Sequence, residues 1–325
     1  MPRKAGCQPA AGWQPAPQNR SVYTETLRRH PLFKPYLALA AVCLFWGTTY
    51  LAIRMSLESF PPLVLVSARY VVSGAILLGF AVARGLHVPR GRELAAACFS
   101  GLLVLGVGNG ALVYAETAIP SGIAGLIVSM SPFWMVAAEA LLPGGERLHA
   151  PTIGAMLVGL AGVGLLFTPE PGTHLFNRNL VYGFLVLQLG MAGWCFGSIY
   201  QRRRSGKAHS AITGAAQQLA AGLILAPLAI AVPQHAVHWS ARGVGALAYL
   251  VVFGSIIGYS AYVYVMDRLP VAIVSVYPYV NSVVAVALGW LFYREPFGAR
   301  ETVSMAAIFS SVALVKRYSR PAAAD

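Results

Sequence analysis

Ten apolar runs follow one another along the chain, and all but the last, which is short, are long enough to cross a bilayer as a helix. A membrane helix needs about 17–25 apolar residues to cross about 30 Å of hydrocarbon. The runs do not alternate polar and apolar residues, so the strands of a membrane barrel fit them poorly. The pattern predicts an all-α integral membrane protein with ten transmembrane helices, at approximately residues 36–55, 62–83, 94–115, 121–142, 151–168, 179–200, 210–231, 243–266, 271–293 and 301–316.

Composition favours a bilayer over water as the solvent around these helices. Of the 325 residues, 57% are hydrophobic and 11% are charged, whereas about a quarter of a typical soluble domain is charged. A single soluble core stops growing near about 250–300 residues, so ten long apolar segments would not share one. The lipid bilayer is therefore the first predicted partner of the chain.

The 24 basic residues lie mainly on one predicted side of the membrane. With the N-terminus in the cytoplasm, 18 fall in cytoplasmic segments, five in external loops and one, Arg69, within a helix. Cytoplasmic loops of membrane proteins carry an excess of Lys and Arg, so both termini are predicted to be cytoplasmic. The net charge of +13 is thus explained by topology, and no nucleic-acid partner is predicted.

Two stretches in opposite halves of the chain read almost alike. FWGTTYLAIR at 45–54 is echoed 150 positions later by CFGSIYQRRR at 195–204. Over about 70 residues the same offset pairs Gly47 with Gly197, Tyr50 with Tyr200, Arg54 with Arg204, Gly108 with Gly258, Tyr114 with Tyr264 and Pro120 with Pro270. A constant offset over that distance indicates a duplicated unit.

Each half contains five predicted helices, so the second copy starts from the opposite side of the membrane. The halves at 35–168 and 179–316 are therefore predicted to be inverted repeats, the architecture of many secondary transporters. Residues 1–34 are rich in Pro, Gln and Arg and are predicted to form a disordered basic cytosolic tail, and residues 317–325 a second cytosolic tail.

Several motifs together resemble one transporter family. They include W-G-x-x-Y in the first helix, Arg69 in the second, and a Gly-Glu or Arg-Glu pair, at Glu146 and Glu295, before the last helix of each half. With YAETAIPSGIAGLIVSMSPFW and DRLPVAIVSVYPYVNSVV, they resemble the EamA branch of the drug/metabolite transporter superfamily. The resemblance implies a ten-helix inner-membrane carrier of small metabolites, often an amino-acid exporter. It also implies a cavity built by helices 1–4 and 6–9, with helices 5 and 10 at the periphery or a dimer contact.

One position departs from that family pattern. Ser282 stands where the pattern has the proline seen in the first half as Pro132. Because a proline interrupts a helix, this difference leaves open whether the fourth and ninth helices bend alike.

Arg69 is the strongest single candidate for substrate binding. It lies about 10 Å into the second helix at 1.5 Å per residue, where an unpaired charge is costly. Facing a cavity, its guanidinium would bind a carboxylate or phosphate. A structural anchor to helix-end carbonyls or an internal carboxylate, or a side chain that reaches the interface, is the alternative.

Two carboxylates are candidates for proton coupling. Glu139 lies late in the fourth helix, and Glu116 lies at the outer end of the third. Desolvation favours the protonated form of such a group, so either is a candidate proton carrier. A hydrated helix terminus is the alternative for Glu116.

Uncharged polar and aromatic residues complete the predicted binding site. Amides within apolar helices must face a cavity or another helix, since hydrocarbon offers them no partner. Aromatic side chains can wall a cavity, although belts at the membrane interface use the same residues. The candidates are Asn109, Gln218 and Asn281, with Trp46, Tyr50, Trp194, Tyr264 and Tyr277. Bonding between helices is the alternative for the amides.

The sequence favours a transporter over an enzyme. All seven histidines fall in predicted loops or the tail, and the four cysteines have no paired spacing. No catalytic residue, metal site or cofactor is therefore predicted, and without a Walker motif ATP is not the direct energy source. We predict secondary-active export of a small metabolite such as an amino acid across the bacterial inner membrane by alternating access, with a proton or another coupling ion. A passive channel and, with less support, a membrane-embedded enzyme stay open, as does the choice between monomer and homodimer.

Overall fold

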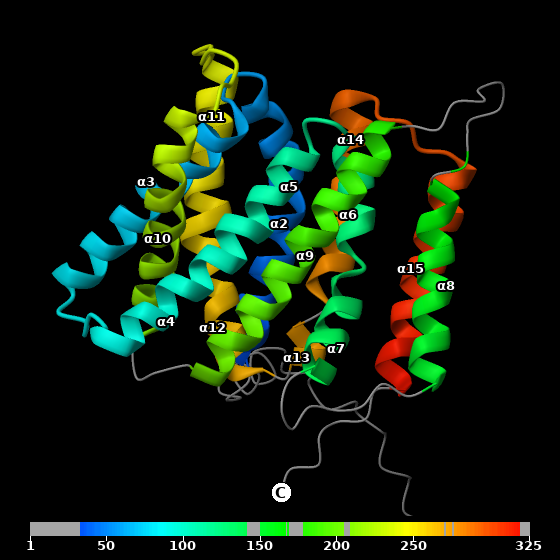
Figure 1. Cartoon of the computed structure of the whole chain (residues 1–325), viewed down its shortest axis with the longest axis horizontal. Coiled ribbons are helices and arrows are strands. Elements are labelled where there is room, and N and C mark those ends of the chain that lie inside the picture. The colour runs from blue at the N-terminus through cyan, green and yellow to red at the C-terminus, as the bar shows by residue number, and fades with distance from the viewer. Residues whose placement is uncertain are drawn as a thin grey trace, which may run out of the picture.

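The computed structural model describes residues 33–141, 150–166, 168, 178–204, 209–269, 271–274 and 276–318. Every regular element in these residues is helical (Figure 1). The first half contains α2 (Phe33–Leu57), α3 (Pro62–Ala83), α4 (Gly91–Gly101), η1 (Leu102–Asn109), α5 (Gly110–Ala115), α6 (Ser121–Val128), α7 (Ser131–Leu141) and α8 (Ala150–Leu166). The second contains α9 (Arg178–Arg204), α10 (Ser210–Ala231), α11 (Ala241–Tyr249), η2 (Leu250–Tyr259), α12 (Ser260–Arg268), α13 (Val271–Val274), α14 (Tyr277–Tyr293) and α15 (Ala299–Tyr318).

Seven helices within these residues are long and apolar enough to cross a membrane. They are α2, α3, the continuous α4–η1–α5, the α6–α7 segment over 121–138, α9, α10, and the continuous α11–η2–α12. The α8 helix is apolar but has 17 residues, as does α14. The all-helical class is thus confirmed, whereas ten crossings and the cytoplasmic placement of both termini stay predictions.

The two halves begin at opposite ends of the helical assembly. In Figure 1, α2 begins at the lower end and α9 at the upper end, while α15 finishes at the lower end, near the level where α2 began. The packing partners also correspond when the halves are exchanged. α2 packs on α14 and on α11–η2–α12 of the second half, and α9 packs on α6–α7 and on α4–η1–α5 of the first half. In the same way α3 packs on α10, and α8 packs on α15.

The predicted fourth and ninth helices are both interrupted, which corrects the expectation of continuous spans. The first interruption lies at 129–130, between α6 and α7, and the second lies between α13 and α14, with a turn at Val276. Each precedes a proline at the second position of the following helix, Pro132 or Pro278, because proline lacks an N–H and disfavours helical geometry before it. Ser282 lies inside the uninterrupted α14, so the two segments do not bend at equivalent residues.

Two π-helical stretches occupy corresponding places in the two halves. η1 ends at Asn109 and η2 at Tyr259, which are 150 residues apart. Such stretches are rare and concentrate at functional sites. The glycine-rich third helix thus changes helix type at η1 but is not broken there.

The α8 and α15 helices form a separate pair at one side of the assembly (Figure 1). Gly162 lets them approach closely, since a Cβ there would lie 2.8 Å from the Cβ of Ala307. Leu157 and Leu160 on α8 are 60% and 49% exposed, as expected for a face covered by lipid. The remaining helices surround the central cavity described next.

Candidate functional site

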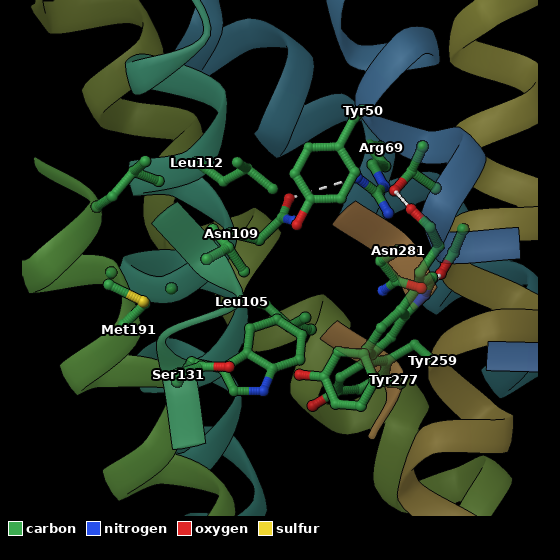
Figure 2. Close-up of a pocket in the computed structure, with 18 of the residues that line it drawn as sticks. Tyr50, Arg69, Leu105, Asn109, Leu112, Ser131, Met191, Tyr259, Tyr277 and Asn281 are labelled. Atoms are coloured by element: carbon green, nitrogen blue, oxygen red, sulfur yellow. Dashed lines mark hydrogen bonds between the residues drawn. The ribbon is translucent and has the colours of Figure 1, made fainter. Parts of the chain in front are cut away.

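A cavity lies between the two halves and is lined by residues from both. Its open space is about 720 Å³ when the solvent space at its mouth is counted. Its walls come from α2, α3, η1, α5, α6 and α7 of the first half and from α9, η2 and α14 of the second. Figure 2 shows Arg69, Asn109 and Asn281 around one central space, with Tyr259 and Tyr277 below it.

Arg69 is the one charged residue among the described residues that line the cavity. It is 4% exposed, and its Nε donates to Ser255 Oγ at 2.8 Å, while Nη1 donates to Asn109 Oδ1 at 3.3 Å. Its guanidinium also lies over the ring of Tyr70, 5.1 Å from the centroid. Both hydrogen bonds are to neutral groups, so they orient the charge without neutralising it.

Polar groups that do not line the cavity fix the position of Arg69. Ser73 Oγ donates to the backbone oxygen of Arg69 at 2.8 Å and also to Gln218 Oε1. Gln218 Nε2 in turn donates to the backbone oxygen of Ser255 at 3.5 Å. Gly254 leaves room for the guanidinium, because a Cβ there would lie 2.7 Å from Arg69 Nη2. The position of the charge is thus fixed by α3, α10 and η2 together.

Aromatic rings build one wall of the cavity. The Trp46 ring lies 5.3 Å from Trp194, 5.3 Å from Tyr277 and 5.1 Å from Tyr262, measured between centroids. Trp46 Nε1 donates to the backbone oxygen of Gly254 at 2.9 Å, and Trp194 Nε1 donates to Tyr262 OH at 3.1 Å. Because both indole N–H groups are bonded, the rings present mainly their apolar surfaces.

Two buried polar atoms at the cavity have no partner among the described residues. They are Asn281 Oδ1 and Tyr259 OH, on side chains that are 2% and 1% exposed. A buried polar group without a hydrogen bond is costly unless a water or a ligand satisfies it. These atoms are therefore candidate contacts for a bound molecule.

Of the two predicted proton carriers, Glu116 is described and does not line the cavity. Glu116 follows the last residue of α5 and is fully buried, with neither carboxylate oxygen bonded within the described part of the chain. Arg54 donates to its backbone oxygen at 2.7 Å, not to its carboxylate. The Glu139 side chain, like Glu146, lies outside the described residues.

The Glu295 carboxylate, from the second half, caps the start of α6 in the first half. Glu295 accepts hydrogen bonds from the Ser121 N–H at 2.9 Å, the Ser121 hydroxyl at 2.8 Å and the Gly122 N–H at 2.9 Å. These groups are at the start of α6, where free N–H groups favour negative charge. Glu295 therefore ties the two halves together.

The EamA-like transporter family model matches residues 33–168 and again 181–317. The chain belongs to the EamA-like transporter family. The resemblance drawn from the sequence motifs is thus confirmed, and the protein is a multi-pass transporter of the inner membrane.

Relatives of this EamA-like transporter are mainly described as transporters. It is similar to the uncharacterized inner membrane transporter YedA of Escherichia coli strain K12, with 35% identity over 91% of this chain and 95% of the relative. The aromatic amino acid exporter YddG of Ancylobacter novellus is 29% identical over 49% of this chain and 55% of its own length. A solved crystal structure covers 86% of this chain and 95% of its own at a TM-score of 0.65 and 24% identity, which shows the fold alone.

The cavity of this EamA-like transporter gathers most of the predicted binding residues. Its lining includes Trp46, Tyr50, Arg69, Asn109, Trp194, Tyr277 and Asn281. Gln218 is instead behind Arg69, and Tyr264 is near the end of α12, where its ring lies 4.8 Å from the Arg268 guanidinium. Whether these residues bind substrate stays a prediction.

The sequence argument missed several lining residues, among them Ser131 and Tyr259. The repeat offset contained the signal for both. Ser131 is 150 residues before Asn281, and Tyr259 is 150 residues after Asn109. Applying the offset to Asn109 and Asn281 would have found them, whereas the same offset takes Arg69 to Leu219, which does not line the cavity.

Proposed function

We propose that this protein is a secondary-active transporter that carries a small amphiphilic metabolite through the cavity between its halves. The observation that carries the proposal is the cavity itself, which both repeats line and which holds one buried cation among aromatic walls. Alternating access follows if the two halves exchange conformations and so expose this cavity to each side in turn.

Three features of the fold support an inverted-repeat mechanism. The family model matches twice, at 33–168 and 181–317. The halves begin at opposite ends of the assembly (Figure 1), and their packing partners correspond when the halves are exchanged. An assembly with this equivalence has two arrangements of similar energy, open to opposite sides, which is the condition for a carrier.

Export is the proposed direction, and an anionic group on the substrate is the proposed contact of Arg69. A carboxylate suits the forked guanidinium, which offers parallel N–H donors. The relative named as an aromatic amino acid exporter supports both a substrate of this size and its direction. The aromatic rings of Trp46, Trp194 and Tyr277 supply apolar surface for the rest of such a molecule.

Glu116 is the proposed proton carrier, and Glu139 stays a second candidate. The buried Glu116 carboxylate has no hydrogen-bond partner among the described residues, so the protonated form is favoured. Arg54 and Glu295 are the charged side chains with which it interacts. Glu116→Gln is expected to abolish accumulation driven by a pH gradient while exchange of substrate across vesicles continues. Loss of both would assign Glu116 a structural role.

Reconstitution into liposomes tests the proposal. Vesicles loaded with unlabelled phenylalanine, lactate, a nucleoside or a cationic drug are diluted into the same labelled compound, and counterflow is recorded. A carrier accumulates label transiently above equilibrium for at least one compound, and Arg69→Ala lowers that signal. Tyr182→Phe is the matched control, since Tyr182 is 47% exposed and does not line the cavity.

A passive channel gives a different result in the same vesicles. It equilibrates the label but never accumulates it, because no conformational exchange couples the two fluxes. A pH gradient likewise produces no concentration of substrate inside. In well-folded protein, label that equilibrates without accumulating, or a pH gradient that does not concentrate substrate, would overturn the carrier proposal.

A further inference from the structure

The charge of the cavity restricts what it can hold. Arg69 contributes a positive charge, and no aspartate or glutamate is found among the described residues that line the walls. No ion pair of Arg69 with a described residue is found either. A buried charge without a counter-charge is unfavourable, so the bound molecule itself is the natural source of the missing negative charge.

The Arg69 guanidinium has N–H groups that can bind an anion. Arginine has five N–H groups, of which one on Nε and one on Nη1 are used by Ser255 and Asn109. The other three have no partner within the described part of the chain. Because Ser255, Ser73 and Gln218 fix the side chain from behind, these donors are held in position before a ligand arrives.

Across the cavity, the second polar contact is a neutral acceptor. Asn281 Oδ1 is buried and unpartnered, and Figure 2 shows Asn281 facing the same space as Arg69. A hydroxyl or an amide N–H can satisfy it with one hydrogen bond. An ammonium group would also find this oxygen, but it would bring a second positive charge to walls that offer no carboxylate.

The remaining walls are apolar and suit a ring or a branched aliphatic group. Leu105, Leu112, Leu187 and Met191 face the cavity together with the aromatic wall. Such surfaces stabilise an apolar body by removing it from water. The lining thus has one anion-binding end, two unpartnered buried polar atoms on Asn281 and Tyr259, and a large apolar region.

We propose that the preferred ligand is a monoanionic carboxylic acid with an aromatic or branched apolar body and a hydroxyl donor, in preference to the zwitterionic amino acid of the same skeleton. Its carboxylate binds the free N–H groups of Arg69, and its hydroxyl donates to Asn281. This inference rests on the proposed transport function, because it names the substrate class of the same cavity.

Three probes with one skeleton test the charge requirement. L-3-phenyllactate is a monoanion with a hydroxyl, L-phenylalanine replaces that hydroxyl by an ammonium, and 2-phenylethylamine has the ammonium without the carboxylate. Calorimetry with purified full-length protein is expected to give phenyllactate affinity at least about tenfold above phenylalanine, and no binding of phenylethylamine. Equal or tighter binding of phenylalanine, binding of phenylethylamine, or no binding of phenyllactate overturns the inference.

Variants of Arg69 assign the preference to its charge. Arg69→Gln is expected to lower phenyllactate affinity to the phenylalanine level, so that the preference disappears. Arg69→Lys keeps the charge but loses the fork, so weaker binding with the preference retained is expected, and this variant decides the question if Arg69→Gln does not fold. Tyr182→Phe, on a side chain that is 47% exposed and does not line the cavity, should leave both affinities unchanged. A preference that survives Arg69→Gln in folded protein overturns the assignment.

Transport of the same probes separates this inference from the proposed function. Uphill movement of phenylalanine but not phenyllactate would overturn the inference and leave the carrier function standing. Preferential binding of phenyllactate, with only passive equilibration across the vesicle membrane, would support the inference and overturn secondary-active transport.

Discussion

Gly254→Ala tests whether the position of the Arg69 guanidinium controls ligand affinity. The added Cβ would lie 2.7 Å from Arg69 Nη2 and 3.1 Å from Thr49 Cγ2, so the guanidinium has to move by roughly 0.7 Å to reach ordinary contact distance. A guanidinium moved by that distance meets the ligand carboxylate with poorer hydrogen-bond geometry. A hydrogen bond to a charged group contributes about 1.5–3 kcal/mol, so loss of one such bond to phenyllactate should lower its affinity by at least about tenfold.

The matched control lies in the same continuous helix. Gly245→Ala makes the same chemical change where nothing approaches the new methyl group within 4 Å. Gly245→Ala gains helix stability of about 0.5–1 kcal/mol relative to glycine, whereas overpacking at residue 254 opposes that gain. Calorimetry of binding is therefore compared after thermal unfolding in detergent shows that both variants are folded. If Gly254→Ala binds phenyllactate as Gly245→Ala does, the guanidinium position does not limit affinity and the reasoning fails.

Three further changes test the packing around the cavity by thermal unfolding or by binding. Gly101→Ala places a Cβ 2.4 Å from the backbone of Gln217, so overpacking should cost about 1–3 kcal/mol and lower the Tm. Gly110→Ala, where nothing lies within 4 Å of the new Cβ, should not lower the Tm. Equal Tm values for the two variants would contradict this. Glu295→Gln weakens the charged cap of α6, so the Tm should fall, and an unchanged Tm would show that the cap is not stabilising. Tyr264→Phe should leave phenyllactate binding unchanged, and a loss would place Tyr264 in the site.

The class of fold could be predicted from hydrophobic runs because lipid requires every span to be a helix or a barrel strand. The runs could not show where a helix is interrupted. The α6–α7 segment is apolar throughout, and its interruption depends on the backbone of Pro132, not on polarity. The π-helical form of η1 was likewise invisible, since its apolar residues fit an α-helix equally well.

The candidate site was predictable where burying a polar group in hydrocarbon is costly. Arg69, Asn109 and Asn281 stood out for that reason, and all three line the cavity. The place of Tyr264 could not be predicted in this way, because aromatic residues are also common at the ends of membrane helices, where Tyr264 lies beside Arg268. Gln218 shows a second limit: an amide needs a partner, but the sequence does not say whether that partner is substrate or, as here, another side chain.

The cavity is symmetric in its positions but not in its chemistry, and this difference bears on how a ligand is held. The repeat offset pairs Asn109 with Tyr259 and Ser131 with Asn281, and all four face the cavity. Arg69 instead corresponds to Leu219, which packs against Gly74 of α3. Once the offset is applied, α14 begins four residues earlier in the second repeat than α7 does in the first, the same shift that separates Pro278 from the place of Ser282. Exchange of the two half-conformations would therefore move the walls while the single cation stays on α3. A ligand anchored at Arg69 would keep one orientation in both open states, with only its apolar surroundings changing.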